Sequence, residues 1–111
     1  MLRKYTIRYV PSARNDLIKM KKYILINFKY LEYGENFDKK IEEASKIIKN
    51  SLLSFEATEF TYRDSLIYMR CINTYLFFYV VDNKKISVLR VLKNGQDWQR
   101  IISLWLKKNN Y

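Results

Sequence analysis

The side chains that could do chemistry in this sequence are those of arginine, lysine and tyrosine, because the chain contains no histidine. Without an imidazole there is no histidine general base, no Cys–His or Ser–His–Asp nucleophilic arrangement, and no zinc or non-haem iron site of the common kinds. The single cysteine, Cys71, lies in an apolar stretch, so we interpret it as a core thiol. Glu42 and Glu43 face different directions on a predicted helix and make a poor acid–base pair. We expect no metal and no cofactor.

Basic and aromatic residues are interleaved in the second half of the chain. The basic residues are Arg63, Arg70, Arg90, Lys93 and Arg100, and the tyrosines among them are Tyr62, Tyr68, Tyr75 and Tyr79. Such a mixture can hold phosphates and stack on bases, and its positive charge could stabilise the transition state that forms a cyclic phosphate. If the chain is an enzyme, the catalytic candidates are Arg63, Arg70, Arg90 and Lys93. The alternative is packing, which we favour for Phe77, Phe78 and Tyr79, because aromatic side chains pack well in strands.

Arg90 stands in the middle of an apolar run, Val88-Leu89-Arg90-Val91-Leu92. An unpaired charge buried at that position would be costly. Arg90 therefore lies either on an open face of the sheet, where it could serve function, or beside a fixed acidic partner. The candidates for that partner are Asp82, Asp97 and Glu59.

The elements that must position these residues begin with a strand over residues 3–9, in which Tyr5, Ile7 and Tyr9 share one face. Pro11 stops this strand, and a helix is predicted over residues 12–30 with Ser12 as the candidate N-cap. Its apolar stripe consists of Ala13, Leu17, Met20, Ile24, Phe28 and Leu31. Glu32-Tyr33-Gly34 is expected to break the helix before a second one, whose stripe consists of Phe37, Ile41, Ala44, Ile48 and Leu52. The two helices should form an antiparallel hairpin.

A sheet is predicted to follow, because the hairpin must bury its stripes against something. Residues 54–65 are polar and mixed, which indicates a loop with room for a short extended piece. Strands are predicted over residues 66–72, 75–81 and 86–92, with turns at 73–74 and 82–85, and the strand over 75–81 is apolar on both faces, as a central strand is. Asn94-Gly95 then leads to a C-terminal helix over residues 96–107. The order is β-α-α-β-β-β-α, an α+β fold with an antiparallel sheet packed against a helical hairpin plus a C-terminal helix.

Composition sets the remaining bounds. A chain of 111 residues is expected to form one domain over residues 1–111. There is neither an apolar signal-peptide region at the N-terminus nor an apolar run of about 18 residues, so we expect a cytoplasmic protein without membrane contact. The net charge is +10, carried by the flanks, since residues 1–31 contribute +7 and residues 58–111 contribute +5.

This charge favours a partner that is acidic or a polyanion such as nucleic acid. The residues that we expect to bind the partner or nucleic acid are Arg14, Lys21, Lys22, Tyr75, Tyr79, Gln96 and Arg100.

Several segments in order resemble one protein family. They are Pro11-Ser12-Ala13-Arg14-Asn15-Asp16-Leu17, the long helical hairpin, Tyr75-Leu76-Phe77-Phe78-Tyr79-Val80-Val81-Asp82, Val88-Leu89-Arg90-Val91-Leu92 and Gly95-Gln96-Asp97-Trp98. Across nearly the whole chain they are similar to the RelE/ParE superfamily of toxins from bacterial type II toxin–antitoxin systems. The resemblance implies plasmid stabilisation or growth inhibition, an acidic antitoxin whose C-terminal segment wraps the toxin, and a toxin–antitoxin complex on operator DNA. It also implies one of two targets, because RelE-like members cut mRNA in the ribosomal A site, whereas ParE-like members poison DNA gyrase and are not nucleases.

The chain departs from the pattern of the nucleases at three places. The nucleases carry an arginine after the first aromatic residue of the central strand, and this chain has Leu76 there. They carry histidine or arginine after the last strand, and this chain has Lys-Asn-Gly-Gln at 93–96. Their final tyrosine has no match in this chain unless Tyr111 serves. The long hairpin is more like ParE, although the His-Gly-Arg-Arg ending of many ParE-like toxins is altered. We therefore expect a ParE-like inhibitor of gyrase that is non-catalytic or weakly catalytic. The alternatives are a ribosome-dependent mRNA interferase, which would be a metal-independent endoribonuclease, and a non-toxic remnant that binds the antitoxin.

Overall fold

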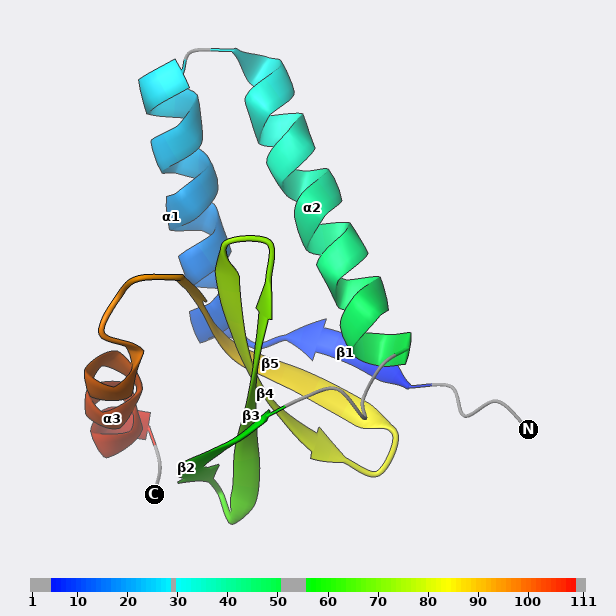
Figure 1. Ribbon diagram of the computed structural model, residues 1–111, viewed down its shortest axis with the longest axis vertical. Coiled ribbons are helices and arrows are strands. Elements are labelled where there is room, and N and C mark those ends of the chain that lie inside the picture. The colour runs from blue at the N-terminus through cyan, green and yellow to red at the C-terminus, as the bar shows by residue number, and fades with distance from the viewer. Residues whose placement is uncertain (1–4, 29, 51–55, 110–111) are drawn as a thin grey trace.

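In the computed structural model, helices surround one five-stranded sheet (Figure 1). The structure describes residues 5–28, 30–50 and 56–109. The elements are β1 (Thr6–Tyr9), α1 (Pro11–Phe28), α2 (Leu31–Asn50), β2 (Glu56–Tyr62), β3 (Ser65–Ile72), β4 (Tyr75–Asp82), β5 (Lys85–Lys93) and α3 (Trp98–Asn109). The predicted α+β class, with a helical hairpin on the sheet and a C-terminal helix, is confirmed. None of the helices in these ranges has both the length and the apolar content that crossing a bilayer requires.

The sheet differs from the prediction in two strands. Its order is β1-β5-β4-β3-β2, and β1 pairs with β5 in parallel, so the sheet is mixed rather than antiparallel. The expected loop over 54–65 contains β2, in which Thr58, Phe60 and Tyr62 are partly buried and alternate with exposed polar residues. The register between β2 and β3 shifts between Ala57 and Thr61, where the Thr58 hydroxyl donates to the Ile67 carbonyl at 2.7 Å. The polar content of this strand concealed its alternation.

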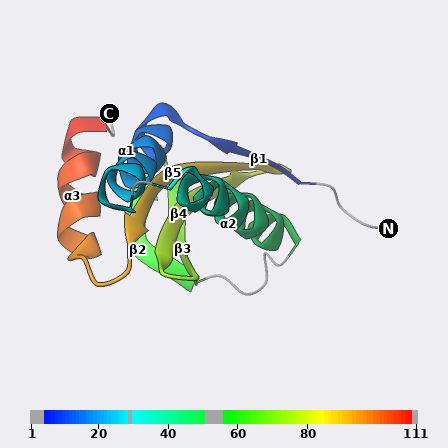
Figure 2. The ribbon, with the colours of Figure 1, turned by 90° about the horizontal axis from the view of Figure 1, so that it is seen from above.

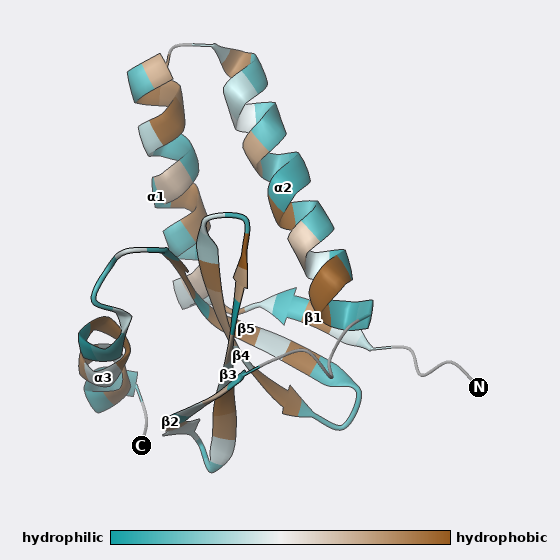
Figure 3. Ribbon diagram, in the orientation of Figure 1, coloured by the Kyte–Doolittle hydropathy of each residue, from teal (hydrophilic) through white to brown (hydrophobic). Residues whose placement is uncertain are grey.

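β4 is the centre of two apolar cores. On the hairpin side, Phe77 and Tyr79 pack with Ala13, Ala44, Ile48 and Val88. On the other side, Phe78 packs with Ile102 and Leu106 of α3. Phe77, Phe78 and Tyr79 are each 0% exposed, which confirms that they belong to the core. Seen from above, the sheet passes between α2 and α3 (Figure 2), and Figure 3 shows the hydrophobic residues of β3, β4 and β5 concentrated there.

The junction between the two helices of the hairpin comes earlier in the chain than predicted. α1 ends at Phe28 and α2 begins at Leu31, so Glu32-Tyr33-Gly34 belongs to α2 and does not break a helix. Gly34 is buried because it lies against α1, where an added Cβ would be 3.0 Å from Leu25 Cδ2. Its role is to let the two helices approach closely. Leu52, the last residue of the predicted stripe, lies outside the described residues.

Side chains complete the edge of β5 beyond the end of β1. In the described part of the chain, β1 pairs with β5 only as far as Val88, and the chain then turns into α1. Ser12 Oγ donates to the Leu89 carbonyl at 2.8 Å, and Asp16 Oδ2 accepts from the Val91 N–H at 3.0 Å. The Lys93 N–H donates to Gln96 Oε1 at 3.0 Å. Ser12 thus serves the sheet edge rather than the helix as an N-cap, because α1 already begins at Pro11.

Arg90 is held by the same carboxylate. Its Nε and Nη2 donate to the two oxygens of Asp16 at 2.7 and 2.9 Å, a bidentate pair. The side chains are 17% and 12% exposed, so the pair is largely shielded from water. The predicted partners Asp82, Asp97 and Glu59 were wrong, because α1 lies along β5 and brings Asp16 to Arg90 across 74 residues of sequence. Of the two alternatives for Arg90, an open sheet face or a fixed acidic partner, the structure shows the fixed partner.

We predict that Asp16→Asn lowers the free energy of unfolding by about 2–4 kcal/mol, because it leaves Arg90 without its counter-charge in a partly buried place. Urea denaturation of the purified chain measures this loss. Asp38→Asn is the matched control, since it breaks an exposed ion pair in which Lys21 Nζ lies 2.7 Å from Asp38 Oδ2. That control should cost at most about 1 kcal/mol. Equal losses in the two variants would contradict a structural role for Asp16.

Candidate functional site

The far end of the hairpin carries apolar side chains that the protein itself does not cover. Seven of the ten large hydrophobic residues found exposed in the described structure lie between residues 18 and 33. They are Ile18, Tyr23, Ile26, Phe28, Tyr30, Leu31 and Tyr33. α1 and α2 extend past the sheet at this end (Figure 1), so no core is available there. An exposed apolar area of this extent is typical of a surface that binds a partner.

The prediction that Phe28 and Leu31 belong to the buried stripe of the first helix was wrong. They are 53% and 78% exposed, because the stripe continues past the end of the sheet. Together with Tyr23, Tyr30 and Tyr33 they form what we call the hairpin tip. Its rings contact one another, with the centroid of Tyr33 lying 5.4 Å from that of Phe28 and 5.9 Å from that of Tyr30.

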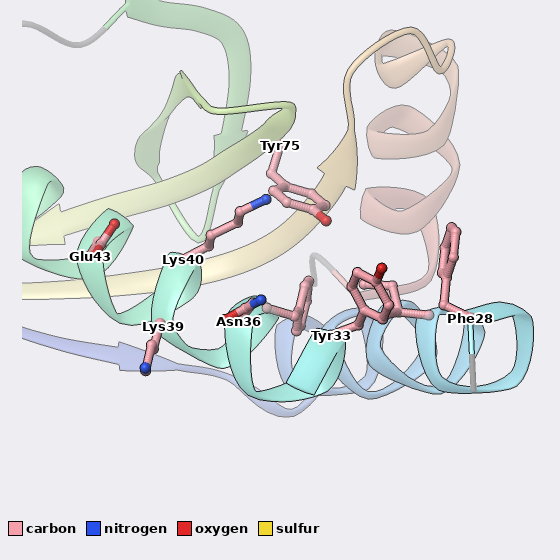
Figure 4. Close-up of a pocket in the computed structure, with 9 residues that line it drawn as sticks. Phe28, Tyr33, Asn36, Lys39, Lys40, Glu43 and Tyr75 are labelled. Atoms are coloured by element: carbon pink, nitrogen blue, oxygen red, sulfur yellow. The ribbon is translucent and has the colours of Figure 1, made fainter. Parts of the chain in front are cut away.

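Two hollows lie between the hairpin tip and the sheet, on either side of Tyr75 at the start of β4. The first has a volume of about 530 Å³ and is lined by Phe28, Tyr33, Phe37 and Tyr75, among others. Figure 4 shows Lys40 at this hollow pointing toward the Tyr75 ring, whereas Lys39 points away. The second, of about 550 Å³, is lined by Lys19, Met20, Tyr23, Ile24, Phe28, Tyr75, Lys93 and Gln96.

We refer to the two hollows together as the hairpin groove, since Ile24, Phe28 and Tyr75 line both. Its floor is aromatic and aliphatic, and its rim carries Lys19, Lys40 and Lys93 together with the acidic Glu43. Phe37 fixes the floor, because its ring meets that of Tyr75 edge-on with centroids 5.7 Å apart. An apolar floor with a lysine rim suits the apolar face of an amphipathic segment whose other face is acidic.

The four catalytic candidates occupy separate places. Arg63 lies in the turn between β2 and β3, and Arg70 lies seven residues along β3, roughly 20 Å away at strand spacing. Arg90 is bound by Asp16, and Lys93 is exposed at the end of β5 beside the hairpin groove. Arg70 acts electrostatically on Tyr79 on the hairpin side of the sheet. The structure therefore does not gather these four cations around one point.

Tyr79 is in the core and is not available to a partner. Its side chain is 0% exposed, so the expected role in binding does not fit this structure. Burial raises the pKa of Tyr79 to about 12, while the positive charge of Arg70 acts to lower it and the neighbouring Tyr68 acts to raise it. Burial also raises the pKa of Tyr75. A phenol with a pKa that high stays protonated at neutral pH and is a poor general base.

The other residues expected to bind a partner are dispersed. Arg14, Lys22, Gln96 and Arg100 are exposed, and Gln96 shares the hairpin groove with Tyr75. Lys21 is engaged by Asp38.

Arg14 lies on the other side of the molecule, in a cavity that also contains Arg8 and Arg63. Arg8 was not among the predicted site residues, although the alternation of this strand puts Arg8 with Thr6 on the face opposite Ile7 and Tyr9, which could have indicated that its side chain points away from the core.

Cys71 is exposed, so the prediction of a core thiol was wrong. It pairs with Leu76 and shares a face of the sheet with Ile67, but it lies near the end of β3, where its thiol approaches the Asn73 carbonyl at 3.7 Å. Within the described ranges, cysteine and acidic side chains do not gather in groups of three or more that could hold a metal ion.

We predict that alkali destabilises the chain partly through Tyr79. The folded pKa of about 12 lies above the ordinary value of 10.0, so the stabilisation is complete below about pH 10 and is lost as pH rises toward 12. Tyr79→Phe should therefore lose roughly 2–3 kcal/mol less stability than the unsubstituted chain over this interval. Urea denaturation at several pH values measures the difference. Tyr23→Phe, at an exposed position, is the control and should leave the pH dependence unchanged.

Known proteins share the sequence pattern and the architecture of this chain. A family model described as the ParE toxin of the type II toxin–antitoxin system, parDE, matches residues 7–98. Among solved structures, the chain is similar to the chromosomal ParDE system from P. aeruginosa, with a TM-score of 0.67 and 13% identity over 85% of this chain and 100% of that one. It is also similar to the RelBE2 toxin–antitoxin complex from Mycobacterium tuberculosis, with a TM-score of 0.54 and 20% identity over 82% of this chain and 99% of that one. No curated protein matches the sequence. The family match spans most of the chain and the structural matches share its fold, so this chain belongs to the ParE toxin family of type II toxin–antitoxin systems.

Proposed function

We propose that this toxin inhibits growth by binding DNA gyrase without cutting RNA, and that an acidic antitoxin neutralises it by covering the hairpin groove. The observation that supports a binding mechanism is the separation of Arg63, Arg70, Arg90 and Lys93. A histidine-free nuclease must place several cationic donors about 3 Å from the charge that develops on the phosphate. Here Arg90 is neutralised by Asp16, Arg63 lies roughly 20 Å from Arg70, and Arg70 and Lys93 belong to strands that β4 separates.

The choice of gyrase follows from the family. ParE-like toxins, which the sequence resembles over nearly its whole length, act on gyrase, and the match over residues 7–98 is to a ParE model. The long hairpin supports this choice, since α1 has 18 residues and α2 has 20. A net charge of +10 would speed encounter with a target that holds DNA, because association between opposite charges is electrostatically steered.

Antitoxin binding at the hairpin groove is also supported by the neighbouring structures, which are a ParDE system and a RelBE2 toxin–antitoxin complex. The exposed rings of Tyr23, Phe28 and Tyr33 are the kind of aromatic anchors that carry most of the energy of an interface. The lysines of the rim would pair with acidic side chains of the antitoxin and set the register of binding.

Induced expression of the chain in bacteria should stop growth with DNA damage signalling, and the purified chain should inhibit supercoiling by gyrase. Arg70→Gln should keep toxicity within about threefold, because this side chain would not act in catalysis. Growth assays, gyrase supercoiling assays and sequencing of mRNA ends measure these outcomes in parallel. Cuts at defined codon positions in translated messages, abolished by Arg70→Gln, would establish an mRNA interferase instead. Harmless expression of a folded chain would indicate a non-toxic remnant.

The double variant Phe28→Ala/Tyr33→Ala should weaken binding of the antitoxin encoded beside this chain by about 30-fold or more, which corresponds to the loss of a hot spot. Leu104→Ala is the matched control, since Leu104 is an exposed hydrophobic residue on α3, away from the groove. Calorimetry or biolayer interferometry measures both affinities. The rate of association should also fall as salt rises from about 50 mM to about 200 mM. An affinity unchanged by Phe28→Ala/Tyr33→Ala would move the interface elsewhere.

A further inference from the structure

A cavity of about 630 Å³ lies away from the hairpin groove, where β1 leads into α1. Three arginines from three separate elements line it: Arg8 from β1, Arg14 from α1 and Arg63 from the turn between β2 and β3. Asp82 is the acidic residue of the lining, so the wall carries two net positive charges. We call this hollow the arginine cavity.

The cavity lies on the sheet face that α3 covers only in part. Val80 and Leu89 belong both to the core beneath α3 and to the lining of the cavity. Past them the face becomes polar, with Arg8 and Ser87 on neighbouring strands. Pro11 also lies in the wall, so the positive end of the 18-residue α1 adds to the potential of the arginines.

Contacts within the protein position two of these arginines. Arg8 Nε donates to Ser87 Oγ at 3.1 Å. The Arg63 guanidinium lies 5.0 Å from the centroid of the Tyr62 ring, which in turn stacks on Trp105 of α3 at 5.4 Å. Such contacts reduce the conformational freedom that a long side chain loses when it binds a ligand.

We propose that the arginine cavity binds a backbone phosphate of a nucleic acid, with room for part of the attached nucleotide. The two non-bridging oxygens of a backbone phosphate are arranged tetrahedrally and can accept from more than one guanidinium fork, whereas the two coplanar oxygens of a carboxylate match a single fork. The protein contains an example of the second case, because the Asp16 carboxylate accepts two bonds from Arg90 and one from the Val91 N–H. Three arginines that line one cavity therefore fit a phosphate better than the side chain of an acidic peptide.

The remaining lining is suited to a nucleotide. The hydroxyls of Ser65 and Ser87 can donate to phosphate or sugar oxygens, and Val10, Val80 and Leu89 offer apolar contact to a sugar or base. The volume is within the range of cavities that hold small organic ligands, so more than the phosphate alone can enter. This inference goes beyond the proposed function, because it concerns a second surface and holds whether or not the hairpin groove binds the antitoxin.

The test uses the full chain, purified without the antitoxin, and a fluorescent single-stranded oligonucleotide of about ten nucleotides. Arg8→Gln/Arg14→Gln should weaken binding about tenfold or more and reduce the slope of log affinity against log salt by about 0.7, as expected when one phosphate is no longer neutralised. The matched control is Lys107→Gln/Lys108→Gln, which removes the same charge at exposed positions near the end of α3. It should weaken binding by less than about threefold.

Arg63→Gln is a second variant, which keeps the result interpretable if Arg8→Gln/Arg14→Gln fails to fold by circular dichroism. Oligoglutamate of equal charge is the competing probe. Equal weakening by the arginine and lysine variants would overturn the proposal in favour of a diffuse field, as would an unsubstituted chain that does not bind the oligonucleotide. Oligoglutamate that binds as tightly, and depends on the same arginines, would show an acidic protein surface as the ligand instead.

Discussion

The Asp16 carboxylate joins helix α1 to strand β5 of the sheet. β1 supplies hydrogen bonds to β5 as far as Val88, and beyond that point the edge of β5 depends on side chains. Asp16 accepts from the Val91 N–H and from Nε and Nη2 of Arg90, so one residue of α1 completes the strand and neutralises its charge. Removing it would leave an N–H and a guanidinium without partners in a place largely closed to water, which is why the position of α1 on the sheet depends on it.

This arrangement explains the distribution of cations. With Arg90 bound to Asp16, two groups of basic residues line hollows beside the sheet. The lysines lie at the groove that α1 and α2 leave on one side, and the arginines lie at the cavity beside β1. A catalytic centre requires convergence, whereas two separate surfaces suit a protein that acts by holding partners.

The sequence was sufficient for features that depend on local pattern. The run from Tyr75 to Val81 is apolar on both faces, which identified the central strand, and the periodicity of the two long helices identified the hairpin. Features that depend on distant contacts were not accessible. The pairing of Asp16 with Arg90 spans 74 residues, and the parallel pairing of β1 with β5 depends on the path of the chain through α1 and α2.

The site was harder to predict for a physical reason. Whether an apolar helical stripe is buried depends on how far the sheet extends beneath it, so Phe28 and Leu31 looked like core in the sequence and are exposed in the structure. Cys71 was misplaced for the same reason, since a position near the end of a strand can share a face with buried residues and still be open to solvent. Tyr79 was suggested as a contact because of its residue type, although its place in the central strand buries it.

The two surfaces differ in the kind of cation that they present, and the difference matches their proposed ligands. The rim of the hairpin groove carries lysines, whose flexible stems and point charges tolerate acidic side chains in many positions along a peptide. The arginine cavity carries guanidinium forks, which recognise a planar or tetrahedral oxyanion by geometry. Lysine at one surface and arginine at the other would let the toxin hold an antitoxin and a nucleic acid at once, because neither ligand needs the residues of the other. The antitoxin would then neutralise the toxin by keeping it from its target, while the arginine cavity would still bind phosphate.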